Sequence, residues 1–187
     1  NQQVFLLVAG AVSGEVTVNG ALLNSAQGDK KVMEALESCG ASVQTKGKEI
    51  TVAKNNLKAF DFDATDCPDL FPPLVALAAY CSGTTSIKGV YRLAHKESDR
   101  AKTLKEEFTK MNVDIELQGD VMVIKGNKQI KGANVTSHND HRIAMACAVA
   151  ALSADGNTAI NHAEAVNKSY PTFFEDLKKL KIDLQIS

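Results

Sequence analysis

The chain has 187 residues, 44% of them hydrophobic, which is enough to bury one sizeable core. Its 21 basic and 22 acidic residues leave a net charge of −1, so no overall basic surface favours nucleic acid. No apolar run approaches the roughly 18 residues of a membrane-spanning helix, and the chain start lacks the positive region of a signal peptide. We therefore expect a cytoplasmic protein that binds neither nucleic acid nor membrane.

The cysteines and histidines show no pattern of a disulfide scaffold or a metal site. The four cysteines lie far apart without a CxxC pair, and the four histidines form no HExxH-like motif. We therefore expect no bound metal, and buried, reduced thiols at Cys39, Cys67, Cys81 and Cys147.

The first third of the chain begins with an apolar stretch. Phe5–Val12 has the composition of the end of a buried helix, but no capping residue precedes it. A β-branched strand follows within Gly14–Gly20, and Cys39–Val43 ends an amphipathic helix and begins another strand. We interpret this third as a structural unit without its opening strand, as expected for a fragment.

The middle third gives the clearest order of elements. An alternating strand comes first, and Pro68 then stands where a proline is tolerated at a helix start. A β-branched strand, an amphipathic helix and a hairpin around Gly119 follow. The predicted elements are Phe60–Ala64, Asp69–Cys81, Thr84–Lys88, Ser98–Met111, Val113–Leu117 and Val121–Ile124.

The last third repeats this order and contains the most apolar helix of the chain. Because that helix is apolar on every side, we expect it to lie in the centre of the fold. The predicted elements are a strand at Val135, helix Ala144–Leu152, strand Thr158–Ile160, helix Thr172–Leu180 and strand Ile182–Ile186.

A repeat of about 70 residues connects the three parts. Similar strand segments begin at Gly14, Gly83 and Gly156, which are 69 and 73 residues apart, and the junctions between the amphipathic helices and their following strands keep the same spacing. One such unit is too small to bury its own core, so the units should pack together. We predict one globular α/β (α+β) domain, residues 1–187, made of three βαβαββ units at approximately 1–55 (incomplete), 56–127 and 128–187.

Basic side chains occur at three predicted helix starts, where the positive helix end makes each unfavourable by roughly 0.3–1 kcal/mol. The three segments are His95–Arg100, Asn139–Arg142 and Asn167–Pro171. A bound anion would explain them, because helix N-termini offer unpaired N–H groups and arginine adds a two-pronged donor. We therefore expect one anionic ligand to be bound by Lys96, Arg100, Arg142 and Lys168.

Each of these residues also has an ordinary interpretation. A lone lysine near a helix start is usually a solvated surface charge. His141 alone is more often a cap or a packed side chain, and Asp69 behind Pro68 is ordinarily an N-terminal helix charge. Their recurrence in phase with the repeat favours a function.

At these positions the sequence resembles the 5-enolpyruvylshikimate-3-phosphate synthase family. Two motifs are specific to this family: K-E-S-D-R at residues 96–100 and N-D-H-R-I-A-M at residues 139–145. The matching motifs occur in the family's order over essentially the whole chain. The other motifs are Asn24–Asp29, Asp66–Asp69 and Lys168–Pro171. The resemblance implies an enolpyruvyl transferase-like inverse α/β domain, the C-terminal portion of a two-domain enzyme.

The resemblance also implies a reaction and the residues that perform it. The enolpyruvyl group of phosphoenolpyruvate would pass to the 5-hydroxyl of shikimate 3-phosphate with release of phosphate, on the route to chorismate and the aromatic amino acids, without a cofactor. The implied catalytic residues are Asp69, Glu97 and His141, and the implied substrate-binding residues are Asp69, Arg92, Lys96, Arg100, Arg142 and Lys168.

Within this set the resemblance suggests individual roles. Arg100, Arg142 and Lys168 correspond to phosphoenolpyruvate ligands. Asp69 would hold the shikimate hydroxyls and is a candidate base, and Glu97 is a candidate acid for the methylene carbon.

Two departures from the family pattern qualify this expectation. Arg92 stands where the family often has asparagine. The family's other domain carries a Lys-Ser pair, a further arginine and a Ser-Ser-Gln stretch, none of which we find here. We therefore expect the chain to need a missing N-terminal domain, to be nearly inactive alone and to bind glyphosate poorly.

Three other interpretations explain the sequence less well. The UDP-N-acetylglucosamine enolpyruvyl transferase shares the repeat but not the two specific motifs. A non-catalytic anion-binding domain of the same fold would not need the intact set of charged residues. A purely structural domain would not explain why these charges recur at equivalent positions of the repeat.

Overall fold

The computed structural model describes residues 2–19, 27–126, 129–180 and 184–185. The helices are α1 (Val4–Ser13), α2 (Gln27–Ser38), α3 (Phe71–Ala79), α4 (Arg100–Lys110), α5 (His141–Ala151) and α6 (Phe173–Lys178). The strands are β1 (Glu15–Asn19), β2 (Ser42–Lys46), β3 (Glu49–Ala53), β4 (Asp61–Asp63), β5 (Thr84–Lys88), β6 (Asp114–Gln118), β7 (Val121–Lys125), β8 (Asn134–Thr136) and β9 (Ala159–Asn161). Short 3₁₀ helices are η2 (Pro68–Leu70), η3 (Val90–Leu93) and η4 (Ala163–Lys168).

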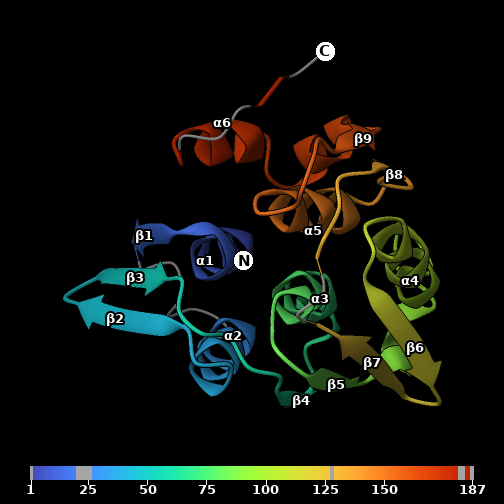
Figure 1. The fold of residues 1–187 in the computed structure, drawn as a ribbon, viewed down its shortest axis with the longest axis horizontal. Helices are drawn as coiled ribbons and strands as arrows, with labels where there is room; N and C mark the ends of the chain where they lie inside the picture. The colour runs from blue at the N-terminus through green and yellow to red at the C-terminus, as the bar shows by residue number, and fades with distance from the viewer. Residues whose placement is uncertain (1, 20–26, 127–128, 181–183, 186–187) are drawn as a thin grey trace.

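The described strands form three sheets, with the orders β1-β3-β2, β4-β5-β7-β6 and β8-β9 (Figure 1). In the first sheet β3 lies antiparallel between β1 and β2, and in the second β7 lies antiparallel between β5 and β6. The pairs β4–β5 and β8–β9 are both parallel. The same pairing pattern thus recurs along the chain, while the proposed unit boundaries stay predictions.

Two turns show why the recurring sequence needs glycine. Gly83 precedes β5 with a φ of 104°, and Gly156 precedes β9 with a φ of 87°. Both angles lie in the left-handed region, which glycine adopts without a steric penalty. The sequence similarity at these positions therefore reflects one turn conformation used twice.

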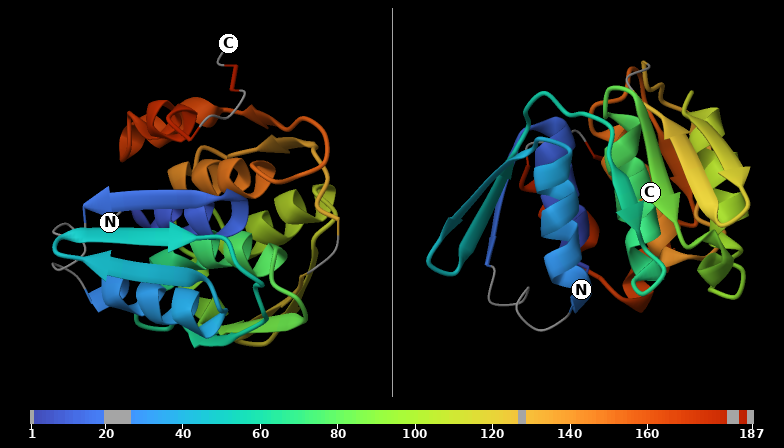
Figure 2. Two further views of the ribbon diagram at one scale, coloured as in Figure 1. Left: turned by 60° about the vertical axis from the view of Figure 1, so that its left-hand side comes forward. Right: turned by 90° about the horizontal axis from the view of Figure 1, so that it is seen from below.

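Helices α1, α3 and α5 lie in the centre, and the three sheets surround them (Figures 1 and 2). Every residue of α3 is buried, as are Val4 to Val12 of α1. Each fully buried leucine or phenylalanine contributes about 1.5–3 kcal/mol relative to exposure, so the central helices supply much of the driving force for folding. The predicted central position of the apolar helices is confirmed.

Helix α4 has one buried face and one exposed face. It buries Ala101, Leu104 and Phe108, while Lys102 and Lys105 remain exposed. The helix therefore covers the core from outside, as its amphipathic pattern predicted.

Several predicted boundaries need correction. The helix predicted at Asp69–Cys81 is a 3₁₀ turn, η2, followed by α3, because Pro72 and Pro73 have no N–H group and fit only the first helical turn. The helix predicted at Ser98–Met111 begins two residues later, because Asp99 is its cap. The strand Thr84–Lys88 is confirmed as predicted.

Other sequence expectations have mixed outcomes. Cys67 is only half-buried, unlike the three other cysteines, and all four are free thiols. The predicted strand Ile182–Ile186 and the segment Asn24–Asp29 fall largely outside the described residues. None of the helices in the described ranges combines the length and apolar character that a membrane span requires.

Candidate active site

Two aspartates set the starts of α4 and α5. Asp99 Oδ1 accepts a hydrogen bond from the Lys102 N–H at 3.4 Å, and Asp140 Oδ1 accepts one from the Arg142 N–H at 3.0 Å. Aspartate suits this position because its carboxylate satisfies an orphan N–H group and faces the positive helix end. The basic side chains that follow each cap are thereby fixed in the first helical turn.

Arg100 joins three parts of the chain through carboxylates. Its Nε donates to Asp140 Oδ2 at 2.7 Å, and its Nη2 donates to Asp140 Oδ1 at 3.2 Å. Nη1 donates to Asp69 Oδ1 at 2.8 Å, and Nη2 also donates to Glu97 Oε2 at 3.3 Å. Arg100 therefore connects η2 and α5 to the start of α4.

The pair of Arg100 and Asp140 is buried and charged. Their side chains are 2% and 0% exposed. Burial opposes ionisation of Asp140, but the Arg100 guanidinium and the Ser98 hydroxyl outweigh it and hold the pKa of Asp140 below its usual range. Burial likewise opposes the charge on Arg100, and its carboxylate partners raise the pKa of the guanidinium. Both groups are ionised at neutral pH, so each depends on the other.

Arg142 has fewer partners, although its side chain is only 12% exposed. Its Nη2 lies 3.3 Å from Asp69 Oδ2, and its Nη1 donates weakly to the Asp69 carbonyl at 3.4 Å. Its buried Nε has no hydrogen-bond partner among the described residues. Burial lowers the pKa of Arg142, and Asp69 counteracts this only in part. A buried guanidinium donor without an acceptor is the feature expected where an anion binds.

Asp69 is the carboxylate on which the cations converge. Its oxygens lie 3.4 Å from Lys96 Nζ, 2.8 Å from Arg100 Nη1 and 3.3 Å from Arg142 Nη2. Burial would raise its pKa, but Arg142, Lys96 and Arg100 outweigh it and keep the pKa of Asp69 below the usual range. Because the side chain is 49% exposed, a ligand can reach it.

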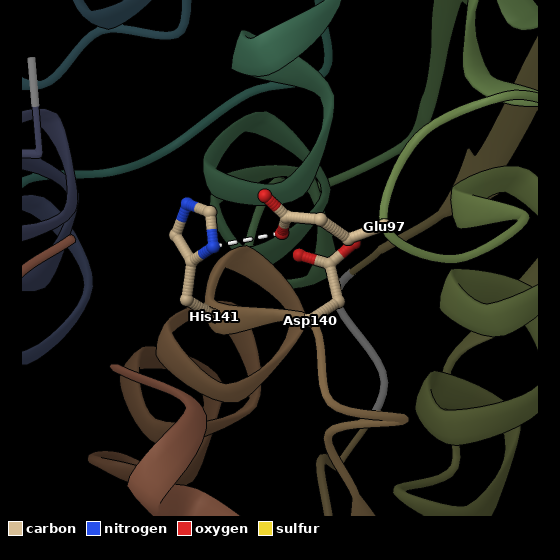
Figure 3. Close-up of side chains that lie close together, drawn as sticks. All are labelled: Glu97, Asp140 and His141. Carbon is tan, nitrogen blue, oxygen red and sulfur yellow. Dashed lines mark ion pairs between the residues drawn. The ribbon is translucent and has the colours of Figure 1, made fainter. Parts of the chain in front are cut away.

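Glu97 and His141 form a second pair at this site (Figure 3). His141 Nδ1 lies 2.7 Å from Glu97 Oε2, the same oxygen that accepts from Arg100. The contact has the distance of an ion pair but lacks hydrogen-bond geometry, so Nδ1 has no hydrogen-bond partner within the described ranges. Burial lowers the pKa of His141 despite the opposing charge of Glu97, which favours the neutral imidazole.

Two groups of side chains in the described part of the chain could gather around a metal ion. In the first group, the Asp140 oxygens already accept from Arg100, from Ser98 and from a backbone N–H. In the second group, the Glu107 oxygens accept from an ammonium, an amide N–H and an imidazole. These cationic and N–H partners would have to be displaced by a metal. The groups are Glu97 with Asp140 and His141, and Glu106 with Glu107 and His138.

The remaining predicted residues lie around this cluster in different ways. Lys168, at the end of η4, donates from Nζ to the Asn139 carbonyl at 2.5 Å, beside the start of α5. Arg92 is exposed in η3, and it makes no ion pair with Asp69 in the described part of the chain. Ion pairs in the structure therefore join six of the predicted residues directly: Asp69, Lys96, Glu97, Arg100, His141 and Arg142. Lys168 contacts the Asn139 carbonyl instead of these side chains.

Two surface hollows in the described part of the chain lie away from this cluster. They have volumes of about 300 and 660 Å³, lie along β9 and α6, and share Thr158, Ile160 and Phe174 in their walls. Neither is lined by the residues that surround Asp69.

Some residues of the site were not singled out from the sequence. Asp140 has no role of its own in the sequence expectations, where it appears only within Asn139–Arg142, yet it is the buried partner of Arg100, 40 residues away. Ser98 supports it with a 3.0 Å hydrogen bond. Glu107 and His138 pair at 2.8 Å behind the cluster. The sequence does hold a signal for Glu107: this glutamate lies on the apolar side of the amphipathic helix, next to Leu104 and Phe108.

Known proteins share both the sequence and the fold of this chain. The 3-phosphoshikimate 1-carboxyvinyltransferase of Brachyspira hyodysenteriae is 43% identical over 178 residues, covering 94% of this chain and 42% of that protein. The protein of the same name from Methanocella arvoryzae is 43% identical over 182 residues, covering 96% of this chain and 43% of that protein. The chain thus spans less than half the length of these relatives.

Solved structures agree with these relatives. An EPSP synthase from Acinetobacter baumannii superposes with a TM-score of 0.80 and 28% identity, covering 94% of this chain and 44% of that one. The enolpyruvyl transferase NikO from Streptomyces tendae, 21% identical with a TM-score of 0.78 over 98% of this chain and 43% of that one, shows the fold alone. The mixed α/β fold predicted from the sequence is confirmed. Residues 2–177 match the family model described as EPSP synthase (3-phosphoshikimate 1-carboxyvinyltransferase), and the chain belongs to this family.

Proposed function

We propose that this chain forms one half of the active site of an enolpyruvyl transferase. The enzyme would move the enolpyruvyl group of phosphoenolpyruvate to the 5-hydroxyl of shikimate 3-phosphate and release phosphate. The observation that carries this proposal is the buried Nε of Arg142, which has no acceptor among the described residues. A substrate carboxylate or phosphate would supply that acceptor, and the family membership supports the choice of substrates.

The charge of the cluster supports a site shared with a second domain. Four cations face three carboxylates, which leaves a net charge of about +1 when His141 is neutral. The two substrates bring two carboxylates and two phosphates, and each phosphate carries about −1.5 to −2 at neutral pH. The cluster alone compensates only a small part of this charge. Further cations are therefore proposed on a missing N-terminal domain, consistent with relatives of more than twice this length.

Asp69 is proposed to bind the shikimate hydroxyls and to accept the 5-hydroxyl proton. Its lowered pKa keeps it ionised, so it can accept hydrogen bonds from hydroxyls, but it also makes it a weak base. A bound substrate anion would pair with Arg142 and Lys96 and weaken their hold on Asp69. The pKa of Asp69 would then rise, so the carboxylate would become a stronger base when the substrate is in place.

Glu97 and His141 are proposed to handle the proton of the methylene carbon. Protonation of that carbon makes C2 of phosphoenolpyruvate cationic, and the 5-hydroxyl oxygen then adds there. Glu97 Oε2 and His141 Nδ1 are 2.7 Å apart, so a small rotation of the imidazole would align them for proton transfer between carboxyl and imidazole. As phosphate leaves the tetrahedral intermediate, the same pair would take a proton back from the methyl group, which restores the enol double bond, and Arg142 and Lys168 would bind the phosphate.

Arg100 is proposed to make a two-pronged substrate contact only after a rearrangement. Arginine has five N–H donors, and four hydrogen bonds to carboxylates already engage Arg100, which leaves one N–H of Nη1. A contact through both N–H groups of Nη1 would require Asp69 to release it. Arg92 stays a predicted shikimate 3-phosphate contact, and the cytoplasmic location and the weak binding of glyphosate also stay predictions.

The proposal can be tested by titrating the chain with phosphoenolpyruvate and shikimate 3-phosphate while NMR chemical shifts are recorded. We expect weak binding that perturbs Arg142 and Lys168 most, and loss of this response in Arg142→Ala. Lys105→Ala, which removes an exposed cation from the outer face of α4, is the matched control and should bind normally. An unperturbed spectrum at millimolar ligand, both alone and with the N-terminal domain of a relative added in trans, would contradict the proposal.

A further inference from the structure

The turn between β8 and α5 has an unusual backbone. His138 and Asn139 have φ angles of 51° and 58°, so two consecutive side-chain-bearing residues adopt the left-handed conformation. Such residues keep this conformation only where surrounding contacts hold it. The turn leads directly into Asp140, the cap of α5, and then into Arg142. The contacts that hold the turn therefore also set the position of the Arg142 guanidinium.

Helix α4 holds this turn at two points. Arg100 and Glu107 are seven residues apart, which places them on one face of the helix about 10 Å apart along its axis. Arg100 binds Asp140 at the end of the turn. Glu107 binds its beginning, because Oε2 accepts from the Thr136 N–H at 2.9 Å and Oε1 lies 2.8 Å from His138 Nε2.

Glu107 is an unusual residue for its environment. Its side chain is 0% exposed, and Lys110 Nζ donates to both of its oxygens at 2.9 and 3.0 Å. Burial opposes ionisation, but His138, Lys110 and the Thr136 N–H outweigh it and keep the pKa of Glu107 below its usual range. A buried charge costs more desolvation than an apolar side chain of the same size, so the gain here is the fixed geometry of its partners.

The other side of the turn is also held. Ser137 Oγ donates to the His162 carbonyl at 2.8 Å and accepts from the Asn139 N–H at 3.1 Å. The Asn139 carbonyl in turn accepts from Lys168 Nζ. A change in the turn would therefore move the acceptor that orients Lys168 as well as the helix start that carries Arg142.

We propose that Glu107 and His138 are positioning residues that hold the turn of residues 137–140 in the conformation required for anion binding. The inference rests on the proposed function. Neither residue belongs to the cluster around Asp69, and both act through Asp140, Arg142 and Lys168.

Glu107→Gln tests the inference, with Glu106→Gln as its matched control. Both variants remove one carboxylate charge from adjacent positions of α4, but Glu106 is exposed and Glu107 is buried. In the ligand-free chain, we expect Glu107→Gln to shift the amide signals of residues 136–140 and the Nε signal of Arg142. If the native turn then occurs in about a tenth of the molecules, phosphoenolpyruvate binding weakens about tenfold. Glu106→Gln should leave the signals and the affinity unchanged.

Variants of His138 cover the case in which Glu107→Gln does not fold, because this side chain lies on the surface at 34% exposure. His138→Ala should weaken binding in the same direction, and His138→Gln, which can still donate to Glu107, should restore it. Wild-type affinity in Glu107→Gln and His138→Ala, with only a lower urea midpoint, would show a merely structural role and overturn the inference.

The ligand-free signals separate this inference from the proposed function. If the wild-type chain binds no phosphoenolpyruvate, the proposed function of the isolated chain fails. The positioning role is then tested on the NMR spectra of the ligand-free variants. Asn139 and Arg142 signals that differ from those of the wild type support it. Signals that coincide with those of the wild type contradict it.

Discussion

Arg100 and Arg142 occupy matching places in the fold, but their donors are used differently. Each lies in the first turn of a helix whose cap is an aspartate, and each is largely buried. Arg100 makes four hydrogen bonds to the carboxylates of Asp69, Glu97 and Asp140. Arg142 has one carboxylate partner and an unsatisfied Nε among the described residues. The residue type and its place on a helix therefore do not decide whether an arginine is structural or available to a ligand.

The pKa shifts express the same difference. Burial acts against both guanidinium groups, but the carboxylates around Arg100 reverse the effect and raise its pKa, whereas the pKa of Arg142 stays lowered. An added anion consequently gains more from Arg142, because it satisfies a charge that the protein leaves poorly compensated. Four experiments test this comparison, in order of their expected effect on the free energy of unfolding.

Arg100→Met should have the largest effect. It leaves the fully buried Asp140 without its partner, and loss of one member of a buried ion pair costs about 3–5 kcal/mol. Urea denaturation measures this loss. The double variant Arg100→Met with Asp140→Asn removes the stranded charge but keeps a capping side chain, so it should recover most of the stability. A single variant as stable as the wild type would show that the pair is not structural.

Acid should destabilise the wild type more steeply than that double variant. The pKa of Asp140 in the folded state lies below its usual value of 3.8, so its contribution is complete above that pH and is lost as the pH falls further. The urea midpoint, measured from pH 7 to pH 3, should therefore decline more in the wild type. Parallel declines would mean that Asp140 does not contribute to acid unfolding.

Ser98→Ala should have a moderate effect. The Ser98 hydroxyl donates to Asp140 Oδ2 at 3.0 Å, and a hydrogen bond to a charged group contributes about 1.5–3 kcal/mol when buried and less when it is partly exposed, as here. We expect a loss of about 1 kcal/mol in urea denaturation. Thr109→Ala, at an exposed position of α4, is a suitable control. Equal effects of the two variants would contradict the assignment.

Arg142→Gln should have the smallest effect on stability and the largest effect on anion binding. Its partner Asp69 is half-exposed, so loss of this ion pair should change the free energy of unfolding by less than about 1 kcal/mol. Phosphoenolpyruvate binding, measured by calorimetry or NMR, should be lost. Strong destabilisation of Arg142→Gln would place Arg142 in the same structural role as Arg100.

Much of the fold could be predicted from local sequence patterns. The strand at Thr84–Lys88 and the central apolar helices follow from β-branched residues and from uniform hydrophobicity. Boundaries near caps and prolines were less certain, because Asp99 and Pro72 act on the backbone in ways that hydrophobic spacing does not reveal.

The members of the site could be predicted, but their pairing could not. Asp69, Glu97, Arg100 and Arg142 were recognised as charges at helix starts and through a family resemblance. Which carboxylate binds which arginine depends on how α4 packs against α5, which joins residues that are 40 positions apart. Glu107 was missed for the same reason, since its partners come from the turn after β8.

The most direct test of the account compares the side-chain Nε signals of the two arginines during a phosphoenolpyruvate titration. We predict that the Arg142 Nε–H signal shifts most as ligand is added, because this donor has no acceptor in the described structure. The Arg100 Nε–H signal should move little, because that donor is held by Asp140 at 2.7 Å. A response centred on Arg100, with an unchanged Arg142 signal, would contradict the proposed difference between the two helix starts.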